Sequence, residues 1–263
     1  MRYQDQAVVV LPYIKNEDFR SYYLSLPLKE MKYYFKSLFE ALAHTHKKKV
    51  IHRDVKPSNF LYSVQNRHGV LVDFGLAERE SEQEIPKPTE NSIQKANSEK
   101  KSKVASYVYR NFNENGIPGV PRKDYRPSIR ANRAGTRGFR APEVLFKVQK
   151  QSTSIDVWSA GSTDDTEALL EIAVLFGKVQ MERLAFDLNR TFFTNIPTVK
   201  DKGIKFEALI KTYSSDSWKS DPDYHTMMPS AIDLLKKCLA LHPSKRISAA
   251  ETLNHPFLCE TIN

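Results

Sequence analysis

The part of the sequence that most constrains the fold lies between residues 27 and 72, where one apolar pattern gives way to another. Pro27 opens a stretch with apolar side chains at helical spacing. These side chains belong to Leu28, Met31, Tyr34, Phe35, Leu38, Phe39 and Leu42. Three short apolar runs follow, at Val50-Ile51, Phe60-Leu61-Tyr62 and Val70-Leu71-Val72. The pattern predicts a long amphipathic helix followed by short strands or extended loops, and therefore an α+β fold.

Size, charge and cysteine content narrow the class of protein. A chain of 263 residues, 40% of them apolar, can bury a sizeable core. Its formal net charge of +9 favours a partner with negative charge, such as nucleic acid, nucleotide or an acidic peptide, or else marks a solvated basic surface. The two cysteines, Cys238 and Cys259, make no disulfide framework. With no apolar run of about 20 residues and no secretory signal, we expect an intracellular protein that does not enter a membrane.

Composition divides the chain into segments. A short β-branched run at residues 7–11, followed by Pro12, predicts a buried strand leading into a linker. Residues 79–133 are rich in Glu, Lys, Ser, Asn and Pro, and we expect them to form a disordered insertion. Apolar helical patterning returns at Val144, at residues 168–176 and at residues 231–241.

Three motifs carry chemistry and occur in a fixed order. Residues 52–59 read His52-Arg53-Asp54-Val55-Lys56-Pro57-Ser58-Asn59. They are followed by Asp73-Phe74-Gly75 and later by Ala141-Pro142-Glu143. The order, the spacing and the short strands between the first two motifs resemble a eukaryotic-type protein kinase. The resemblance implies a protein-kinase-like fold that transfers phosphate from ATP.

The resemblance assigns a role to each polar residue of these motifs. Asp54 would orient the substrate hydroxyl group and accept its proton. Asn59 and Asp73 would supply oxygen ligands to Mg²⁺. Lys56 would neutralise the γ-phosphate, and its presence marks the Ser/Thr-kinase form of the loop. Thr136 resembles the threonine whose hydroxyl group contacts Asp54 and Lys56 in those enzymes.

Other residues of the kinase pattern are expected to be structural. His52 and Phe74 would pack between the lobes. Asp156 would accept hydrogen bonds from the backbone of the catalytic loop. Glu143 would pair with Arg246. The run His255-Pro256-Phe257 resembles the end of the last kinase helix, and we expect it to contribute packing.

Two longer stretches point to one group of kinases. The run from Val55 to Tyr62, and the run from Ala134 to Glu143, look most like DDK, the cell-division-cycle-seven replication kinases. A long insertion between the second and third motifs is also typical of that group. The resemblance implies a nuclear enzyme that is activated by a Dbf-type regulatory subunit. It also implies action on the minichromosome-maintenance helicase at the initiation of DNA replication.

Two arginines near the third motif indicate a substrate preference. The resemblance implies that Arg137 and Arg140 flank the loop that contacts the residue after the phospho-acceptor. Guanidinium groups bind carboxylate or phosphate in a bidentate manner. We therefore predict Ser or Thr followed by Asp, Glu or a phosphorylated residue. Alternatively, one of the arginines only braces the activation segment.

The chain departs from the family at its start. A kinase needs a Gly-rich loop, a lysine on the third strand and a glutamate on the αC helix, and none is found in this sequence. We expect residues 1–15 to be a remnant of the last N-lobe strand and hinge, and residues 16–257 to form the C-lobe. Leu11 would then be the gatekeeper. Pro12, Tyr13 and Ile14 would form the hinge that contacts adenine.

A second departure follows Gly161. Compared with the long αF helix of kinases, roughly four to five turns are missing here, at about 3.6 residues per turn. Thr163 could cap a new helix, and the apolar residues Leu169, Leu170 and 172–176 suit burial. We hypothesise that this segment takes the place of the missing turns.

Three functions remain open from the sequence. The first is a Ser/Thr kinase whose isolated chain is weakly active or inactive. The second is a catalytically dead module that binds a regulatory subunit or substrate. The third, which we do not favour, is nucleic-acid binding by the basic insertion. Its basic residues are Lys100, Lys101, Lys103, Arg110, Arg122, Lys123, Arg126, Arg130 and Arg133.

Overall fold

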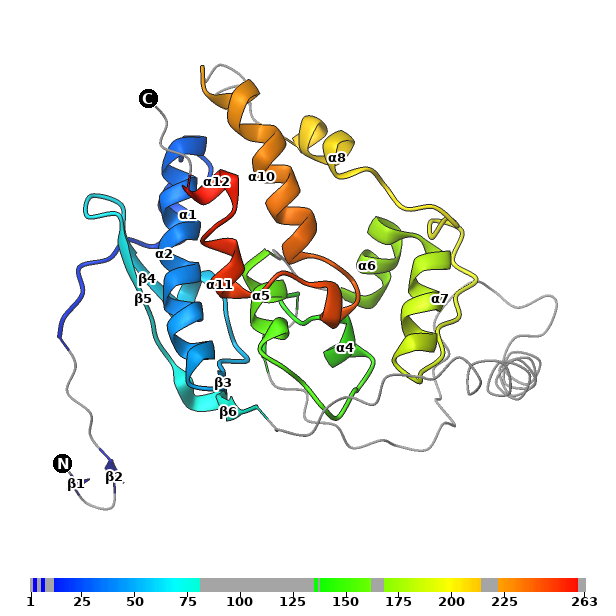
Figure 1. Cartoon of the computed structure of the whole chain (residues 1–263), viewed down its shortest axis with the longest axis horizontal. Coiled ribbons are helices and arrows are strands. Elements are labelled where there is room, and N and C mark those ends of the chain that lie inside the picture. Colours follow the sequence, from blue (N-terminus) through cyan, green and yellow to red (C-terminus); the bar gives the residue numbers. More distant parts are fainter. Residues whose placement is uncertain are drawn as a thin grey trace.

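The structure, a computed structural model, describes residues 2–3, 6–7, 12–80, 135–136, 138–161, 168–213 and 222–259. Helices dominate these residues and the strands are short (Figure 1). The α-helices are α1 (Phe19–Tyr22), α2 (Leu28–Lys47), α4 (Pro142–Leu145), α5 (Ser154–Gly161), α6 (Ala168–Phe176), α7 (Lys178–Asp187), α8 (Phe206–Tyr213), α10 (Tyr224–Cys238), α11 (Ala249–Thr252) and α12 (Pro256–Cys259). The expected class, mostly helical with short strands, is therefore confirmed.

Every sheet within the described residues has two antiparallel strands. The strands are β1 (Arg2–Tyr3), β2 (Gln6–Ala7), β3 (Val50–Ile51), β4 (Phe60–Ser63), β5 (His68–Leu71) and β6 (Glu78–Arg79). β1 pairs with β2, β3 with β6, and β4 with β5. Three short 3-10 helices, η1 (Pro57–Asn59), η2 (Phe74–Leu76) and η3 (Pro243–Lys245), connect longer elements.

The predicted amphipathic helix is α2, which lies between the β4–β5 hairpin and α11 (Figure 1). Leu38, Phe39 and Leu42 of its apolar stripe are almost fully buried. The Tyr34 ring meets the Phe60 and Tyr62 rings of β4, with centroids 5.3 and 5.0 Å apart. Burial of this stripe fixes the hairpin against α2, and the catalytic loop enters the hairpin at η1.

A second core cluster forms around α4, α5, α6 and α7. Ala141, Ala173 and Met181 are completely buried there, and Trp158 of α5 is 3% exposed. α10 contacts both α5 and α2 (Figure 1). The catalytic loop is thus supported by two cores that α10 joins.

The region around Gly161 is described on both sides of a gap, where α5 ends at Gly161 and α6 begins at Ala168. Residues 162–167, including the expected capping residue Thr163, lie outside the described residues. α6 packs against α4 and α7, and one of its faces buries Ile172 and Ala173 while Glu171 is exposed. Replacement of the missing turns by this segment stays a prediction.

The structure describes only part of two predicted segments, the N-terminal remnant at residues 1–15 and the insertion at residues 79–133. β2 ends at Ala7, so of the strand expected at residues 7–11 only Ala7 is described, and Leu11 is not. Arg79 ends β6, and the backbone N–H of Glu80 donates to the carbonyl of Lys49 at 2.9 Å. The structure therefore describes two residues of the expected insertion, and residues 81–134 lie outside it. The division into residues 1–15 and 16–257 stays a prediction.

No helix in the described part of the chain combines the length and the apolar character needed to cross a bilayer.

Candidate active site

The candidate site is built on the loop between β3 and β4. Asp54 and Asn59 are buried in it, 7% and 6% exposed. The η1 turn folds the loop back, so that the Asn59 side-chain amide donates to the Asp54 backbone carbonyl at 2.9 Å and to its Oδ2 at 3.0 Å. Asn59 therefore fixes the orientation of the Asp54 carboxylate.

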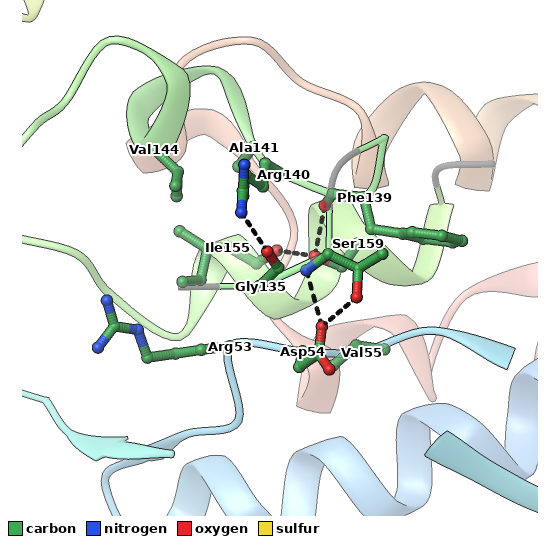
Figure 2. A pocket seen from close by; sticks show the side chains of 11 residues that line it. Arg53, Asp54, Val55, Gly135, Phe139, Arg140, Ala141, Val144, Ile155 and Ser159 are labelled. Carbon is green, nitrogen blue, oxygen red and sulfur yellow. Dashed lines mark hydrogen bonds between the residues drawn. The ribbon is translucent and has the colours of Figure 1, made fainter. Parts of the chain in front are cut away.

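Thr136 and Lys56 complete the hydrogen bonding of this carboxylate. The Thr136 backbone N–H and hydroxyl group donate to Asp54 Oδ1 at 2.8 and 2.7 Å. Lys56 Nζ lies 2.8 Å from Asp54 Oδ2 and donates to Thr136 Oγ1 at 2.7 Å. Figure 2 shows Asp54 on the loop below Gly135, the neighbour of Thr136. The structure thus brings all three residues predicted as catalytic into one hydrogen-bonded group.

Two opposing effects set the pKa of the Asp54 carboxyl group. Burial raises the pKa, whereas hydrogen bonds from Lys56 and Thr136, together with the positive charge of Lys56, lower it. The balance holds the pKa below its ordinary value of 3.8. The Asp54 carboxyl group is therefore ionised at neutral pH.

Asp73 lies two residues after the end of β5. β5 pairs with β4, and β4 begins directly after Asn59. The backbone N–H of Val72 donates to the Asn59 carbonyl at 2.9 Å, which places Asp73 beside that residue. Asp73 is exposed, has φ 62° and accepts a hydrogen bond from the Gly75 N–H at 3.3 Å. Arg53 also has a positive φ, 71°. Strained non-glycine residues of this kind cluster at functional sites.

The donor set at Asn59 and Asp73 fits Mg²⁺, which prefers carboxylate and amide oxygens. The Asn59 NH₂ group makes the contacts to Asp54, so those contacts do not use its amide oxygen. Among the described residues, no three His, Cys, Asp or Glu side chains are grouped to hold a metal ion. Two protein ligands are the arrangement expected when substrate phosphates and water supply the remaining oxygens.

Asp156 anchors the catalytic loop from α5. Its carboxylate accepts hydrogen bonds from the backbone N–H groups of His52 and Arg53, both at 2.8 Å, and contacts His46 Nε2 at 2.9 Å. The prediction that Asp156 holds the catalytic-loop backbone is confirmed. The His46 contact was not predicted, because nothing in the local sequence distinguishes this histidine from its neighbours.

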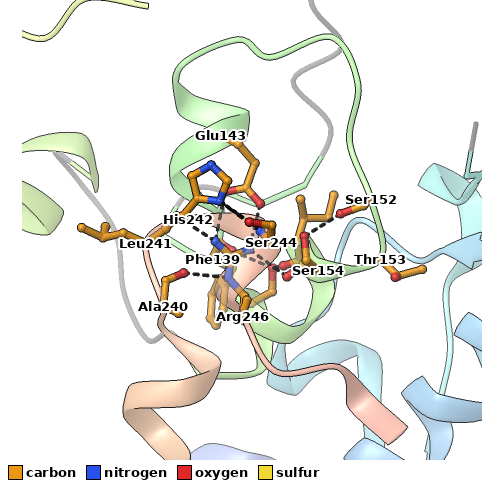
Figure 3. Close-up of polar contacts among 12 residues, drawn as sticks. Phe139, Glu143, Ser152, Thr153, Ser154, Ala240, Leu241, His242, Ser244 and Arg246 are labelled. Atoms are coloured by element: carbon orange, nitrogen blue, oxygen red, sulfur yellow. Dashed lines mark hydrogen bonds and ion pairs between the residues drawn. The ribbon is translucent and has the colours of Figure 1, made fainter. Parts of the chain in front are cut away.

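The second predicted scaffold contact is the ion pair between Glu143 and Arg246 (Figure 3). The Arg246 guanidinium donates to both Glu143 oxygens, at 2.8 and 3.1 Å. It also donates to the carbonyl of Ser154 at 2.9 Å. The pair is confirmed, and it ties α4 and the start of α5 to the segment after α10.

The His52 and Phe74 rings contact each other, and their packing between lobes stays a prediction. Their centroids are 4.6 Å apart in an edge-to-face arrangement, and His52 Nε2 contacts the Val72 carbonyl at 3.0 Å. The Phe74 side chain is 47% exposed. This contact fixes the start of the Asp73-Phe74-Gly75 segment against the catalytic loop.

The other predicted binding residues either have no described contact with Asp54, Lys56 or Thr136, or lie outside the described residues. Arg140 donates from Nη2 to the Gly135 carbonyl at 2.5 Å, a contact that braces the segment before Thr136. Arg137 and Leu11 lie outside the described residues. Pro12 and Tyr13 are exposed and Ile14 is half-buried, in a segment that is neither helix nor strand. The roles given to these residues stay predictions.

One polar contact at the site was missed by sequence reasoning. Arg53 donates through Nη1 to Glu78 of β6 and through Nη2 to Gln151 at 3.1 Å. Glu78 stands one residue before the expected insertion, among other acidic and basic residues, so its sequence context carries no signal. Only the pairing of β3 with β6 brings it to Arg53.

Comparison with known proteins assigns this fold and site to a class. The family model for the protein kinase domain matches residues 1–108 and 119–258. Most of the chain, including the catalytic loop and the Asp73-Phe74-Gly75 segment, falls within this match.

Curated relatives define the group. The cell cycle serine/threonine-protein kinase hsk1 of Schizosaccharomyces pombe is 43% identical over 98% of this chain and 54% of its own length. The cell cycle protein kinase spo4 of the same species is 39% identical, over 98% and 64%. The probable cell division control protein 7 homolog 2 of Encephalitozoon cuniculi is 35% identical, over 97% and 73%. The chain belongs to the protein kinase family, in its Cdc7/Hsk1 group of cell-cycle kinases.

The matches also show differences in length. The chain spans 54% and 64% of the two fission-yeast relatives. The alignment with hsk1 runs over 278 positions, more than the 263 residues of this chain. The relative therefore has residues without a counterpart in this chain.

Proposed function

We propose that this chain carries the catalytic loop of a Ser/Thr protein kinase, which transfers the γ-phosphate of ATP to serine or threonine in protein substrates. The observation that carries the proposal is the Asp54 carboxylate, held at once by Lys56, Asn59 and Thr136. Such a group is costly to bury, and it serves a reaction that depends on positioning and charge neutralisation.

In this proposal each residue acts through the geometry around Asp54. Asp54 accepts a hydrogen bond from the substrate hydroxyl group and takes its proton as the phosphate bond forms. Because its pKa is low, Asp54 mainly orients the nucleophile and is a weak base in the ground state. Lys56 lies on the same side and stabilises negative charge on the transferred phosphate. Asn59 and Asp73 hold Mg²⁺, which neutralises phosphate charge when it is bound with ATP.

Binding of the two substrates is proposed for residues on either side of this group. Leu11, Pro12, Tyr13 and Ile14 contact adenine. Arg137 and Arg140 favour an acidic or phosphorylated residue after the phospho-acceptor. Arg140 also donates to the Gly135 carbonyl, and this contact braces the segment before Thr136.

By likeness to cell-cycle kinases, we place the protein in the nucleus, at the initiation of DNA replication. A Dbf-type regulatory subunit and subunits of the minichromosome-maintenance helicase are the partners that we propose. The 263 residues contain no Gly-x-Gly-x-x-Gly loop. We therefore expect weak or no phosphate transfer by this chain alone, and a catalytically dead binding module is the alternative function.

Two measurements on the full chain test the proposal. Calorimetry should detect binding of Mg-ATP that Asp73→Asn abolishes, and a dead binding module would show none. Radiolabelled ATP should transfer phosphate to peptides with Ser or Thr followed by Asp, in the presence of a Dbf-type subunit. Asp54→Asn should abolish this transfer while Mg-ATP binding persists. Equal activity of Asp54→Asn and the unchanged chain would overturn the proposal.

A further inference from the structure

Ser159 connects α5 to the segment that precedes α4. Its hydroxyl group lies 2.7 Å from the Phe139 carbonyl oxygen and 3.0 Å from the Ile155 carbonyl oxygen, one turn earlier in α5 (Figure 2). A hydroxyl group has one hydrogen to donate, so the two carbonyls share it. By α-helix geometry, the Ile155 carbonyl also accepts a backbone N–H. Among the described residues, no donor other than Ser159 bonds the Phe139 carbonyl, so this carbonyl depends on the hydroxyl group.

Burial makes the bond to Ser159 matter for the backbone. Ser159 is 8% exposed, so the Phe139 carbonyl is turned toward the protein interior. A polar group that loses its partner at such a place does not regain the bond to water that it gave up. Val157 and Trp158, the neighbours of Ser159 in α5, are 1% and 3% exposed, and they hold the helix in the core. The hydroxyl group therefore gives the Phe139 carbonyl a fixed point of attachment.

The bond orients the peptide unit from which Arg140 begins. The Phe139 carbonyl and the Arg140 N–H belong to one planar unit, so fixing the carbonyl also fixes the direction in which the Arg140 backbone continues. Arg140 Nη2 donates to the Gly135 carbonyl at 2.5 Å. The next residue, Thr136, bonds Asp54 through its N–H and its hydroxyl group. The anchored peptide unit thus lies in the same segment as the hydrogen-bonded group of the active site.

We propose that Ser159 is a positioning residue for substrate choice. Its hydroxyl group fixes the Phe139–Arg140 peptide unit, and Arg140 is thereby placed to bind an acidic residue after the phospho-acceptor. Ser159 touches neither substrate nor ATP. The effect on substrate choice rests on the proposed function, whereas the orientation of the peptide unit does not. Because the hydroxyl group is the part required, Ser159→Thr should keep the effect and Ser159→Ala should lose it.

The orientation of the peptide unit can be measured without kinase activity, by nuclear magnetic resonance of the full chain. Phenylalanine is labelled with ¹³C at its carbonyl and arginine with ¹⁵N, so that a carbonyl–amide signal arises only where Arg follows Phe. This occurs at Phe19-Arg20 and at Phe139-Arg140. The experiment therefore yields one signal for the bonded carbonyl and one internal reference.

The shift of the Phe139 carbonyl carbon reports its hydrogen bond. Ser159→Ala should move this signal upfield, because a carbonyl carbon loses deshielding when its donor is removed, and Ser159→Thr should leave it in place. The Phe19 signal should stay constant in both variants, since its carbonyl accepts the Tyr23 N–H of another helix end, at 3.0 Å. A Phe139 signal that is the same in Ser159→Ala and the unchanged chain would overturn the proposal.

Substrate choice is tested by steady-state kinetics in the presence of the regulatory subunit. Two peptides are compared that differ only after the phospho-acceptor, one with Ser-Asp and one with Ser-Ala. Ser159→Ala should lower the ratio of their kcat/KM values about fivefold, the size expected for one hydrogen bond. The kcat for the Ser-Ala peptide and the KM for ATP should change little. Ser159→Thr should restore most of the ratio.

Ser230→Ala is the matched control. Ser230 is a half-buried serine of α10 whose hydroxyl group donates to the Met227 carbonyl of its own helix at 2.9 Å. Neither the Phe139 signal nor the peptide ratio should change in this variant. An equal ratio in Ser159→Ala and the unchanged chain would refute the inference, as would a common loss of kcat for both peptides with a raised KM for ATP. If the unchanged chain transfers no phosphate or does not prefer Ser-Asp, the proposed function fails, and the carbonyl signal still decides the role of Ser159.

Discussion

At the scale of single residues, Thr136 shows how one side chain serves two partners. Its hydroxyl group accepts a hydrogen bond from Lys56 and donates one to Asp54. A serine can make both bonds, whereas valine has the same shape but neither accepts nor donates. The hydroxyl group, rather than the methyl group, should therefore matter for positioning.

We expect Thr136→Val to lower kcat about 100-fold, because loss of both bonds frees the Asp54 carboxylate and the Lys56 ammonium to shift. Thr136→Ser should retain most of the activity. Steady-state kinetics with the regulatory subunit measures both variants, and similar rates for Val and Ser would contradict this role.

The two cysteines differ in accessibility and in pKa. Cys238 of α10 is 2% exposed, and burial raises the pKa of its thiol to about 12. Cys259 is exposed at the end of α12. A thiol reacts as the thiolate, and with a raised pKa Cys238 stays protonated well above pH 8.

Iodoacetamide at pH 8 should therefore label one cysteine per folded chain, Cys259, and two after unfolding in guanidinium chloride. Mass spectrometry of the labelled peptides distinguishes the two sites. Rapid labelling of Cys238 in the folded chain would show that α10 does not pack as described.

At the scale of elements, the β4–β5 hairpin depends on a close contact at Gly69. A Cβ added there would lie 2.2 Å from the Phe60 ring, on the neighbouring strand. The Gly69 N–H also donates to the Ser37 hydroxyl group of α2 at 2.9 Å. Glycine is thus required here by space rather than by backbone angles.

Gly69→Ala should destabilise the chain by about 1–3 kcal/mol, because the Phe60 ring must move within a packed core. His68→Ala, at an exposed site on the same strand, is the matched control and should have little effect. Urea unfolding followed by tryptophan fluorescence measures both, and equal midpoints would contradict the steric argument.

The elements that sequence predicts well are those with local patterns. The helical stripe from Leu28 to Leu42 predicted α2, and short β-branched and aromatic runs predicted β3, β4 and β5. By contrast, the packing of α6 against α4, and the contact of Glu78 with Arg53, join residues that are distant in sequence. Neither leaves a periodic signal, because both depend on how the chain folds back.

At the scale of the whole molecule, the pair of Glu143 and Arg246 joins segments 103 residues apart in the sequence. The Arg246 side chain is 0% exposed and that of Glu143 is 3% exposed. Breaking a buried pair leaves an uncompensated charge and is more costly than losing a surface pair.

We expect Glu143→Gln to lower the free energy of unfolding by about 3 kcal/mol, because Arg246 keeps its charge inside the protein. Glu207→Gln removes the carboxylate of a surface pair with Lys236 and should cause no measurable change. Chemical denaturation of the two variants compares them directly, and equal midpoints would show that Glu143 does not offset the Arg246 charge.

The hydrogen bonds to Asp156 determine how easily the backbone of the catalytic loop can open. Its carboxylate holds the His52 and Arg53 amide hydrogens from within α5, which is packed between α2 and α10. These hydrogens can exchange with deuterated solvent only when α5 separates from the loop, and that separation requires both cores to open. Their exchange rates should therefore match those of the slowest amides in α2. The catalytic loop would then open as rarely as the protein core.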